Sequence, residues 1–151
     1  MDVHSPSQRS FNMSRIRSKD TKPELVVRRW LWSHGYRYRL HRRDLPGTPD
    51  IVLPRYHAVL LIHGCFWHRH GCSATTMPAT HRNFWTAKFK ENVSRDKCVV
   101  EELQKDGWRV MIVWECCLRG KNADPTAAGE QIRDWLESDI RYGVCERPGR
   151  Q

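Results

Sequence analysis

The sequence predicts an α/β fold in which one mixed β-sheet is flanked by helices, and two observations lead to this prediction. Residues 51–53 and 58–62 are short apolar runs separated by Pro54-Arg55, which is typical of an antiparallel hairpin buried on both faces. A helical pattern at residues 81–105 then separates the second run from another apolar run at 109–114. A long helix between two buried strands predicts a parallel crossover, so both kinds of pairing occur in one sheet.

Capping residues predict the first helix. Thr21 is a suitable N-cap, Pro23 fits a first turn, and Glu24 completes a capping box, so we expect a helix that ends at His34-Gly35. Four of its side chains are expected to face inward: Leu25, Val26, Trp30 and Leu31. Residues 36–40 then form a predicted strand and residues 45–49 a turn.

Apolar spacing predicts the later helices. The helix at 81–105 ends at Asp106-Gly107 and carries one apolar stripe, made of Phe89, Val93, Val100 and Leu103. A last amphipathic helix is expected at 124–138, with inward residues Ile132, Trp135 and Leu136. The chain is then one domain at residues 21–142, with a basic N-terminal arm at 1–20 and a loose C-terminal tail at 143–151.

The composition favours a polyanionic partner. Lys and Arg number 26 against 17 Asp and Glu, which gives a formal net charge of +9. Nucleic acid fits this balance first and an anionic membrane second, while a merely basic surface is the plain alternative. No apolar run reaches the ~18 residues of a membrane span, and residues 1–20 lack a signal-peptide core. We therefore expect a cytoplasmic protein whose cysteines bind metal, with Cys98 and Cys145 as spare thiols.

The segment from residue 63 to 72 has the spacing of metal ligands. The predicted ligands are Cys65, His70, Cys72 and Cys116. Four such ligands complete the tetrahedral coordination of a structural zinc. Cys117 competes with Cys116 for the last place, and strand alternation lets one of the two face the loop. Buried cysteines beside solvated histidines are the alternative. His63 and His68 stay outside this set, and an imidazole so placed can do proton chemistry near neutral pH.

Asp50 opens an apolar strand directly after Pro-Gly-Thr-Pro. A turn aspartate that caps its own backbone is the simpler interpretation. The polar end of the neighbouring strand, Ile62-His63, favours a metal site instead, because a carboxylate and a carbonyl across a hairpin form an oxygen site for magnesium. Magnesium beside a histidine is an arrangement that cleaves phosphodiesters.

Three aromatic residues stand out near the metal loop. Phe66 and Trp67 are adjacent between metal ligands and point in different directions, so at least one is expected to be exposed. Trp85 begins the long helix, where it can also continue the apolar stripe. On a basic protein, exposed aromatic rings can stack on bases or wedge between them.

Several motifs together point to a known family. They span residues 12 to about 135 and include Leu45-Pro-Gly-x-Pro-Asp50, His63-Gly-Cys-Phe-Trp-His68, Pro78-Ala-Thr, Phe84-Trp85, Asn92-Val93-x-Arg95-Asp96, Gly107-Trp-Arg-Val and Val113-Trp-Glu-Cys116. The pattern resembles the very short patch repair endonucleases of bacteria. That resemblance implies a restriction-endonuclease-like core with a structural zinc site. It also implies an enzyme that nicks DNA 5′ to the thymine of a T:G mismatch left by deamination of 5-methylcytosine.

The resemblance also implies roles for individual residues. Asp50 and the main-chain oxygen of Ile62 would bind magnesium, and His68 would be the general base. His63 would support the metal-bound waters or the scissile phosphate, and Glu24 would be a further acidic group of the catalytic site. The residues expected to contact DNA are Met13, Phe66, Trp67, Trp85, Lys88 and Asn92. Arg15 and Arg17 of the basic arm are expected to contact DNA as well.

The chain departs from the family pattern at a few positions. Ile62 replaces a usual threonine, and His63 stands where the broader nuclease fold has lysine. Arg69 and Gly71 replace histidines of the loop, which removes rival zinc ligands. Two other functions compete: a zinc-containing DNA-binding module without activity, and a restriction endonuclease that cuts matched DNA. As an enzyme, the chain is expected to act as a nucleoid-associated monomer, with mismatch-repair proteins as candidate partners.

Overall fold

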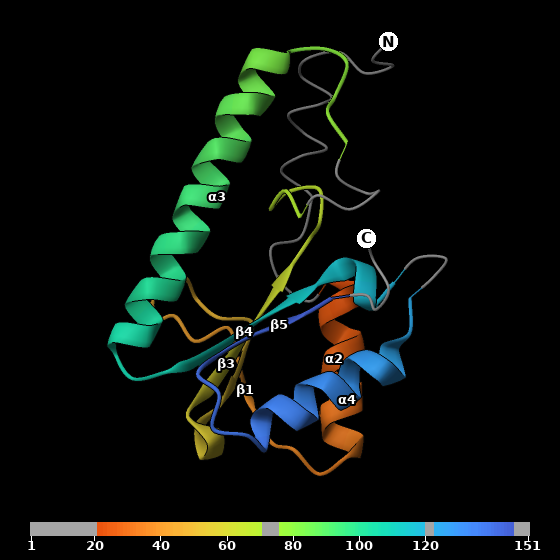
Figure 1. The fold of residues 1–151 in the computed structure, drawn as a ribbon, viewed down its shortest axis with the longest axis vertical. Helices are drawn as coiled ribbons and strands as arrows, with labels where there is room; N and C mark the ends of the chain where they lie inside the picture. Colours follow the sequence, from red (N-terminus) through yellow and green to blue (C-terminus); the bar gives the residue numbers. More distant parts are fainter. Residues whose placement is uncertain (1–20, 71–75, 120–122, 147–151) are drawn as a thin grey trace.

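A five-stranded mixed sheet organises the molecule, in the order β1-β2-β3-β4-β5 (Figure 1). The computed structural model describes residues 21–70, 76–119 and 123–146. The strands are β1 Arg39–Leu40, β2 Ile51–Leu53, β3 Ala58–His63, β4 Arg109–Trp114 and β5 Tyr142–Cys145. The pairs β1–β2 and β2–β3 are antiparallel, whereas β3–β4 and β4–β5 are parallel. The α/β class and the mixed sheet are therefore confirmed.

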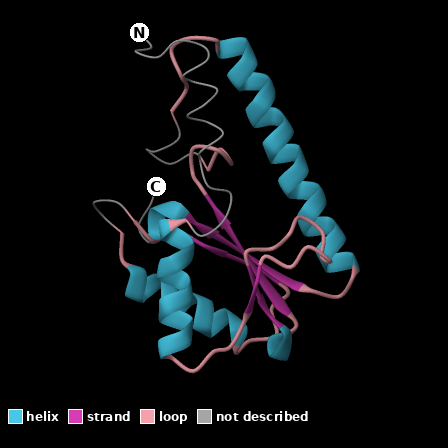
Figure 2. Ribbon diagram, turned by 180° about the vertical axis from the view of Figure 1, so that it is seen from behind, coloured by secondary structure: helices cyan, strands magenta, loops and turns pink. Residues whose placement is uncertain are grey.

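Helices cover both faces of this sheet. The described helices are α2 Lys22–Ser33, α3 Arg82–Lys105 and α4 Pro125–Leu136, with short 3₁₀ turns at Pro54–Tyr56 and Glu115–Cys117. Helices α2 and α4 lie together on one side, and α3 crosses the other side and extends well beyond the strands (Figures 1 and 2). Among the described helices, none is long and apolar enough to cross a membrane.

Alternation along the strands divides the core into two clusters. On β3, Leu60 packs with residues of α2 and α4, such as Leu31 and Ile132. Its neighbours Val59 and Leu61 point to the other face, where they pack with Leu103 of α3. Both faces of β2 and β3 are buried, as expected for strands between two helical layers.

The start of α2 agrees with the predicted cap. The Thr21 hydroxyl accepts a hydrogen bond from the Glu24 N–H at 3.5 Å, and His34 is the C-cap. The inward face differs from the prediction, because Val27 is buried whereas Leu25 and Val26 are half-buried. The first turn of α2 lies in the interior, where Pro23 and Glu24 are buried.

Three further sequence predictions need correction. The tail predicted to be loose from residue 143 contains β5, which pairs with β4 as far as Cys145. The strand predicted at 36–40 is reduced to Arg39–Leu40. Val93, placed on the inward stripe of the long helix, is 45% exposed. Its side chain lines an open pocket together with His68 and Trp114 instead of packing into the core.

Candidate active site

Asp50 lies at the start of β2 and is tied to β3. Its Oδ2 accepts a hydrogen bond from the Ile62 N–H at 2.8 Å, so the carboxylate faces the carboxyl end of β3. Burial raises the pKa of Asp50 to about 6; the Ile62 N–H opposes this shift, and the nearby Glu24 adds to it. A carboxylate that is disfavoured by burial gains most from a bound cation.

Glu24 approaches Asp50 from the first turn of α2 and is only 1% exposed. Its Oε2 contacts the Arg28 guanidinium and lies 2.9 Å from Nε2 of His41. Donor atoms of Glu24, His41 and Asp50 all lie within 4.8 Å of one another, so the three could share a metal ion. The predicted acidic group and the predicted magnesium ligand are thus brought together.

The two predicted catalytic histidines stack on each other. The rings of His63 and His68 are 3.9 Å apart and nearly parallel. Nδ1 of His68 lies 2.5 Å from Oδ2 of Asp96, a residue of α3. Burial lowers the pKa of His63 to about 3, and the adjacent His68 adds to this shift. His63 is therefore neutral at physiological pH, and a neutral His68 that donates through Nδ1 presents Nε2 as a proton acceptor.

These groups share one cleft of about 750 Å³. Its wall includes Asp50, Ile62, His63 and His68, and two arginines, Arg43 and Arg95, also line it. A carboxylate, imidazoles and guanidinium groups around one cleft suit an anionic substrate that needs both a cation and a base. Phosphodiesters belong to that class.

The predicted aromatic residues form a cluster beside this cleft. Phe66 contacts Trp67, Trp85 and Phe89 at ring-centroid distances of 5.1 to 5.9 Å. Phe66 and Trp67 are half-buried, whereas Trp85 is 8% exposed and is thus largely enclosed. The neighbouring Phe84, at 55% exposed, is the most accessible aromatic of this region.

Helix α3 connects the cluster to the catalytic groups. Asn92 donates from its Nδ2 to the main-chain oxygen of Trp67 at 3.2 Å, which fixes the loop against the helix. Lys88 is half-buried one turn before it. Asp96, one turn after it, holds His68. Residues 88, 92 and 96 therefore form one face of α3 that follows the loop.

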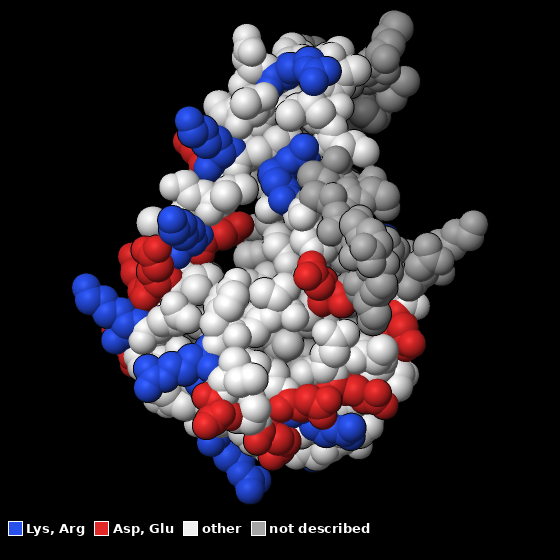
Figure 3. All heavy atoms as spheres, in the orientation of Figure 1, with Lys and Arg blue, Asp and Glu red and all other residues white. Residues whose placement is uncertain are grey.

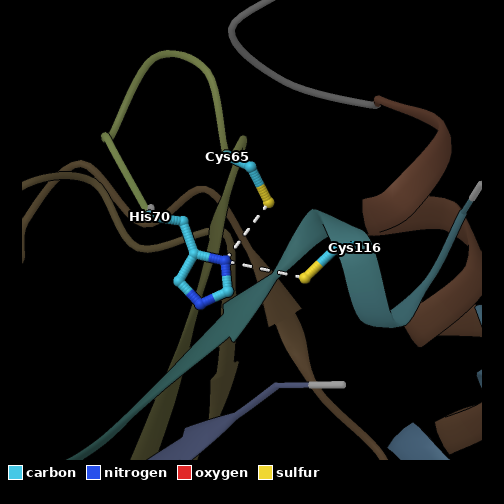
Figure 4. Close-up of side chains that lie close together, drawn as sticks. All are labelled: Cys65, His70 and Cys116. Atoms are coloured by element: carbon cyan, nitrogen blue, oxygen red, sulfur yellow. Dashed lines mark hydrogen bonds between the residues drawn. The ribbon is translucent and has the colours of Figure 1, made fainter. Parts of the chain in front are cut away.

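A second group of side chains fits zinc. Sγ of Cys65 and Sγ of Cys116 each lie 3.6 Å from Nδ1 of His70 (Figure 4). Around a tetrahedral zinc with ordinary Zn–S and Zn–N bonds, sulfur and nitrogen ligands lie about 3.5 Å apart, so the donor set and its spacing fit this metal. Cys117 turns away and donates to the Cys145 carbonyl at 3.1 Å. Cys72 lies outside the described residues, as do Met13, Arg15 and Arg17.

Sequence reasoning missed three residues of these sites. His41 contacts Glu24, Asp96 contacts His68, and Oε2 of Glu146 lies 2.8 Å from Nε2 of His70. Asp96 could have been found, because it continues the four-residue spacing of Lys88 and Asn92. No sequence pattern indicated His41 or Glu146, because each meets its partner only when strand pairing brings distant segments of the chain together.

Comparisons with known proteins identify the family of this chain. The family model described as DNA mismatch endonuclease Vsr matches residues 1–74. The chain is 42% identical over 136 residues to the "DNA mismatch endonuclease Vsr" of Escherichia coli, a match that covers 89% of this chain and 87% of that protein. The chain belongs to this family. Its activity is that of a DNA endonuclease.

Other members of the family are named as nicking enzymes. The "Type II nicking enzyme V.XorIIP" of Xanthomonas oryzae pv. oryzae is 50% identical over 136 residues, which cover 90% of this chain and 97% of that protein. The "Type II nicking enzyme V.NmeAIP" of Neisseria meningitidis is 45% identical over 120 residues, covering 80% of this chain and 86% of that protein. The match thus extends over almost the whole described fold.

Proposed function

We propose that this endonuclease nicks one strand of duplex DNA, on the 5′ side of the thymine in a T:G mismatch. The main observation in support is a cleft that holds Asp50, His63 and His68 directly beside an aromatic cluster. The names of two relatives, a mismatch endonuclease and a nicking enzyme, agree with this proposal. Such a T:G pair arises when 5-methylcytosine is deaminated.

In this proposal Asp50 and the main-chain oxygen of Ile62 hold magnesium, with Glu24 as the second acid of the site. Bound magnesium would offset charge on the phosphate. His68 takes the proton from the attacking water through Nε2, because Asp96 engages its Nδ1. His63, kept neutral by burial, supports the phosphate without adding charge.

In this proposal the aromatic cluster provides the selectivity for a mismatch. A T:G pair stacks less well than a matched pair, so opening the step beside it costs less. Phe66 and Trp67 are partly accessible and can enter such a step, with Trp85 as the ring that backs them. Zinc on Cys65, His70, Cys72 and Cys116 would hold the loop that carries both rings.

The decisive test uses two duplexes of one sequence, one with a single T:G pair and one fully matched, each strand labelled separately. We expect one nick, in the thymine strand of the mismatched duplex, that requires magnesium. Cleavage of both strands of the matched duplex would indicate a restriction endonuclease instead. Tight binding of both duplexes without any cleavage would indicate a DNA-binding module.

A further inference from the structure

His41 has no role in the proposed reaction, although it lies in the wall of the catalytic cleft. Its Nε2 is buried and faces Oε2 of Glu24 at 2.9 Å, yet it makes no hydrogen bond of acceptable geometry to the described residues. A buried nitrogen that points at a carboxylate without a proper hydrogen bond is costly. Such a nitrogen is well placed to donate its lone pair to a cation between the two groups.

The spacing of the donors supports this interpretation. Around an octahedral cation with bonds near 2.1 Å, neighbouring ligands lie about 3.0 Å apart. His41 and Glu24 approach this separation at 2.9 Å, and an oxygen of Asp50 lies within 4.8 Å of both donors. The His41–Glu24 distance is that of two neighbouring ligands of one ion, and Asp50 lies close enough to contribute a third donor.

The backbone holds His41 in this position. Its N–H donates to the Asp50 carbonyl at 3.2 Å, so the two residues are linked across β1 and β2. Its φ is +47°, in the left-handed region that residues with a Cβ seldom adopt. A non-glycine residue in this conformation is strained, and such residues are concentrated at functional sites.

We propose that His41 is a direct ligand of the catalytic cation, together with Glu24 and Asp50, and that the site therefore accepts a divalent first-row transition ion more tightly than magnesium. Imidazole is a ligand for such ions, whereas magnesium prefers oxygen alone. The inference rests on the proposed metal-dependent reaction, because it concerns the same cation. It adds a ligand and a metal preference that the reaction itself does not require.

The charges around the site are compatible with a divalent ion. Two carboxylates and the Arg28 guanidinium leave one negative charge, so a divalent ion would bring the site to one positive charge. A DNA phosphate then neutralises the site. We therefore expect the ion to bind the protein alone and to bind more tightly once DNA is present.

The test measures Mn²⁺ binding to the zinc-containing protein without DNA, by electron paramagnetic resonance. The variant is His41→Asn, since Asn tolerates a left-handed backbone but is too short to replace the imidazole. His57→Asn is the matched control, because His57 is also left-handed, with φ +51°, and is exposed away from the cleft. Magnesium affinity is measured on all three proteins by competition.

We expect a nitrogen ligand in the pulsed spectrum of bound Mn²⁺, present in the parent and in His57→Asn and lost in His41→Asn. The same change should lower the affinity for Mn²⁺ by at least about tenfold and the affinity for magnesium much less. An unchanged nitrogen signal in His41→Asn overturns the proposal. Equal losses for both ions, without a nitrogen signal in the parent, also overturn it, because His41 would then merely position Glu24.

The outcome is independent of the nicking assay. If Mn²⁺ binds through His41 but the T:G duplex is not cut, the proposed function fails and the metal site stands. If the duplex is cut with magnesium while His41 gives no nitrogen signal and the variant binds Mn²⁺ like the parent, the inference fails alone.

Discussion

Burial acts on Asp50 and His63 in the same sense, because it favours the uncharged form of each. It raises the pKa of the Asp50 carboxyl to about 6 and lowers that of the His63 imidazole to about 3. Without a cation, the cleft therefore holds an acid that is reluctant to ionise and a histidine that stays neutral. A bound cation would restore the Asp50 carboxylate, so metal binding and ionisation are coupled in this site.

Asp50→Asn should abolish nicking and leave DNA binding largely intact, because the shape is kept and the charge that holds magnesium is lost. The metal-free variant should also be more stable than the parent at pH 7, by on the order of 1–3 kcal/mol, because the burial of a charge is relieved. Nicking, binding and chemical denaturation on the same preparation measure all three effects. If the variant nicked DNA at the parental rate, Asp50 would have only a structural role in the turn.

The same raised pKa predicts a pH dependence. Asp50 is ionised above about pH 6 and protonated below it, so magnesium affinity and nicking at subsaturating magnesium should fall as the pH drops through 6. More magnesium should move this midpoint to lower pH, because the ion competes with the proton. The nicking rate, measured as a function of pH at three magnesium concentrations, checks this. A midpoint that ignores magnesium would assign the titration to another group.

The contact between Asp96 and His68 predicts a graded pair of variants. His68→Ala should slow single-turnover nicking about 10²- to 10⁴-fold, the usual range for a general base. Asp96→Asn should slow it less, since the base remains and only its orientation and tautomer are disturbed. Single-turnover rates decide the order. A larger loss for Asp96→Asn than for His68→Ala would move the proton transfer away from His68.

At the level of elements, the described part of the site depends on a few junctions. The loop after β3 carries Cys65 and His70, and the turn after β4 carries Cys116, so a zinc ion would fasten the ends of two parallel neighbours (Figure 4). Glu146, just past β5, contacts His70 from the third strand end. A carboxylate on the second nitrogen of a metal-bound histidine orients the ring.

Cys116→Ala should therefore lower the zinc content and destabilise the fold, because the binding energy of a structural zinc is part of the folding energy. Cys98→Ala is the control, since Cys98 is exposed on α3. Elemental analysis and thermal unfolding of both variants give the result. If the two variants keep equal zinc and equal stability, the cluster at His70 does not hold the metal.

The elements also show what the sequence could predict. The helices and the strands β2, β3 and β4 follow from caps and apolar runs, and local motifs placed Asp50, His63 and His68 in one cleft. β5 was missed because its exposed Tyr142 and Val144 give no buried pattern, and its strand conformation depends on pairing with β4. His41 was missed for a related reason: its proximity to Glu24 follows from the register of β1 with β2 and from the packing of α2.

Across the whole molecule, charge is unevenly distributed. The formal net charge is +9, yet the lower part of the face in Figure 3, where α4 lies, carries acidic side chains interspersed with basic ones. The N-terminal half of α3, towards the aromatic cluster, carries Arg82, Lys88 and Lys90 against the single acid Glu91. The basic excess on this half of α3 would attract a polyanion towards the aromatic cluster.

The last prediction separates this general attraction from mismatch recognition. Trp67→Ala should reduce affinity and also the preference for T:G over matched DNA, because the wedge acts where pairing is already weak. Arg15→Ala or Arg17→Ala, on the arm outside the described residues, should weaken binding to both duplexes equally. Each should also reduce the slope of log affinity against log salt by about one, as expected when one phosphate contact is lost. Binding at several salt concentrations, with single-turnover nicking on both duplexes, distinguishes the two classes. A Trp67→Ala variant that keeps the parental T:G preference would return this ring to a packing role, and selectivity would then have to come from the exposed Phe84 or from contacts by α3.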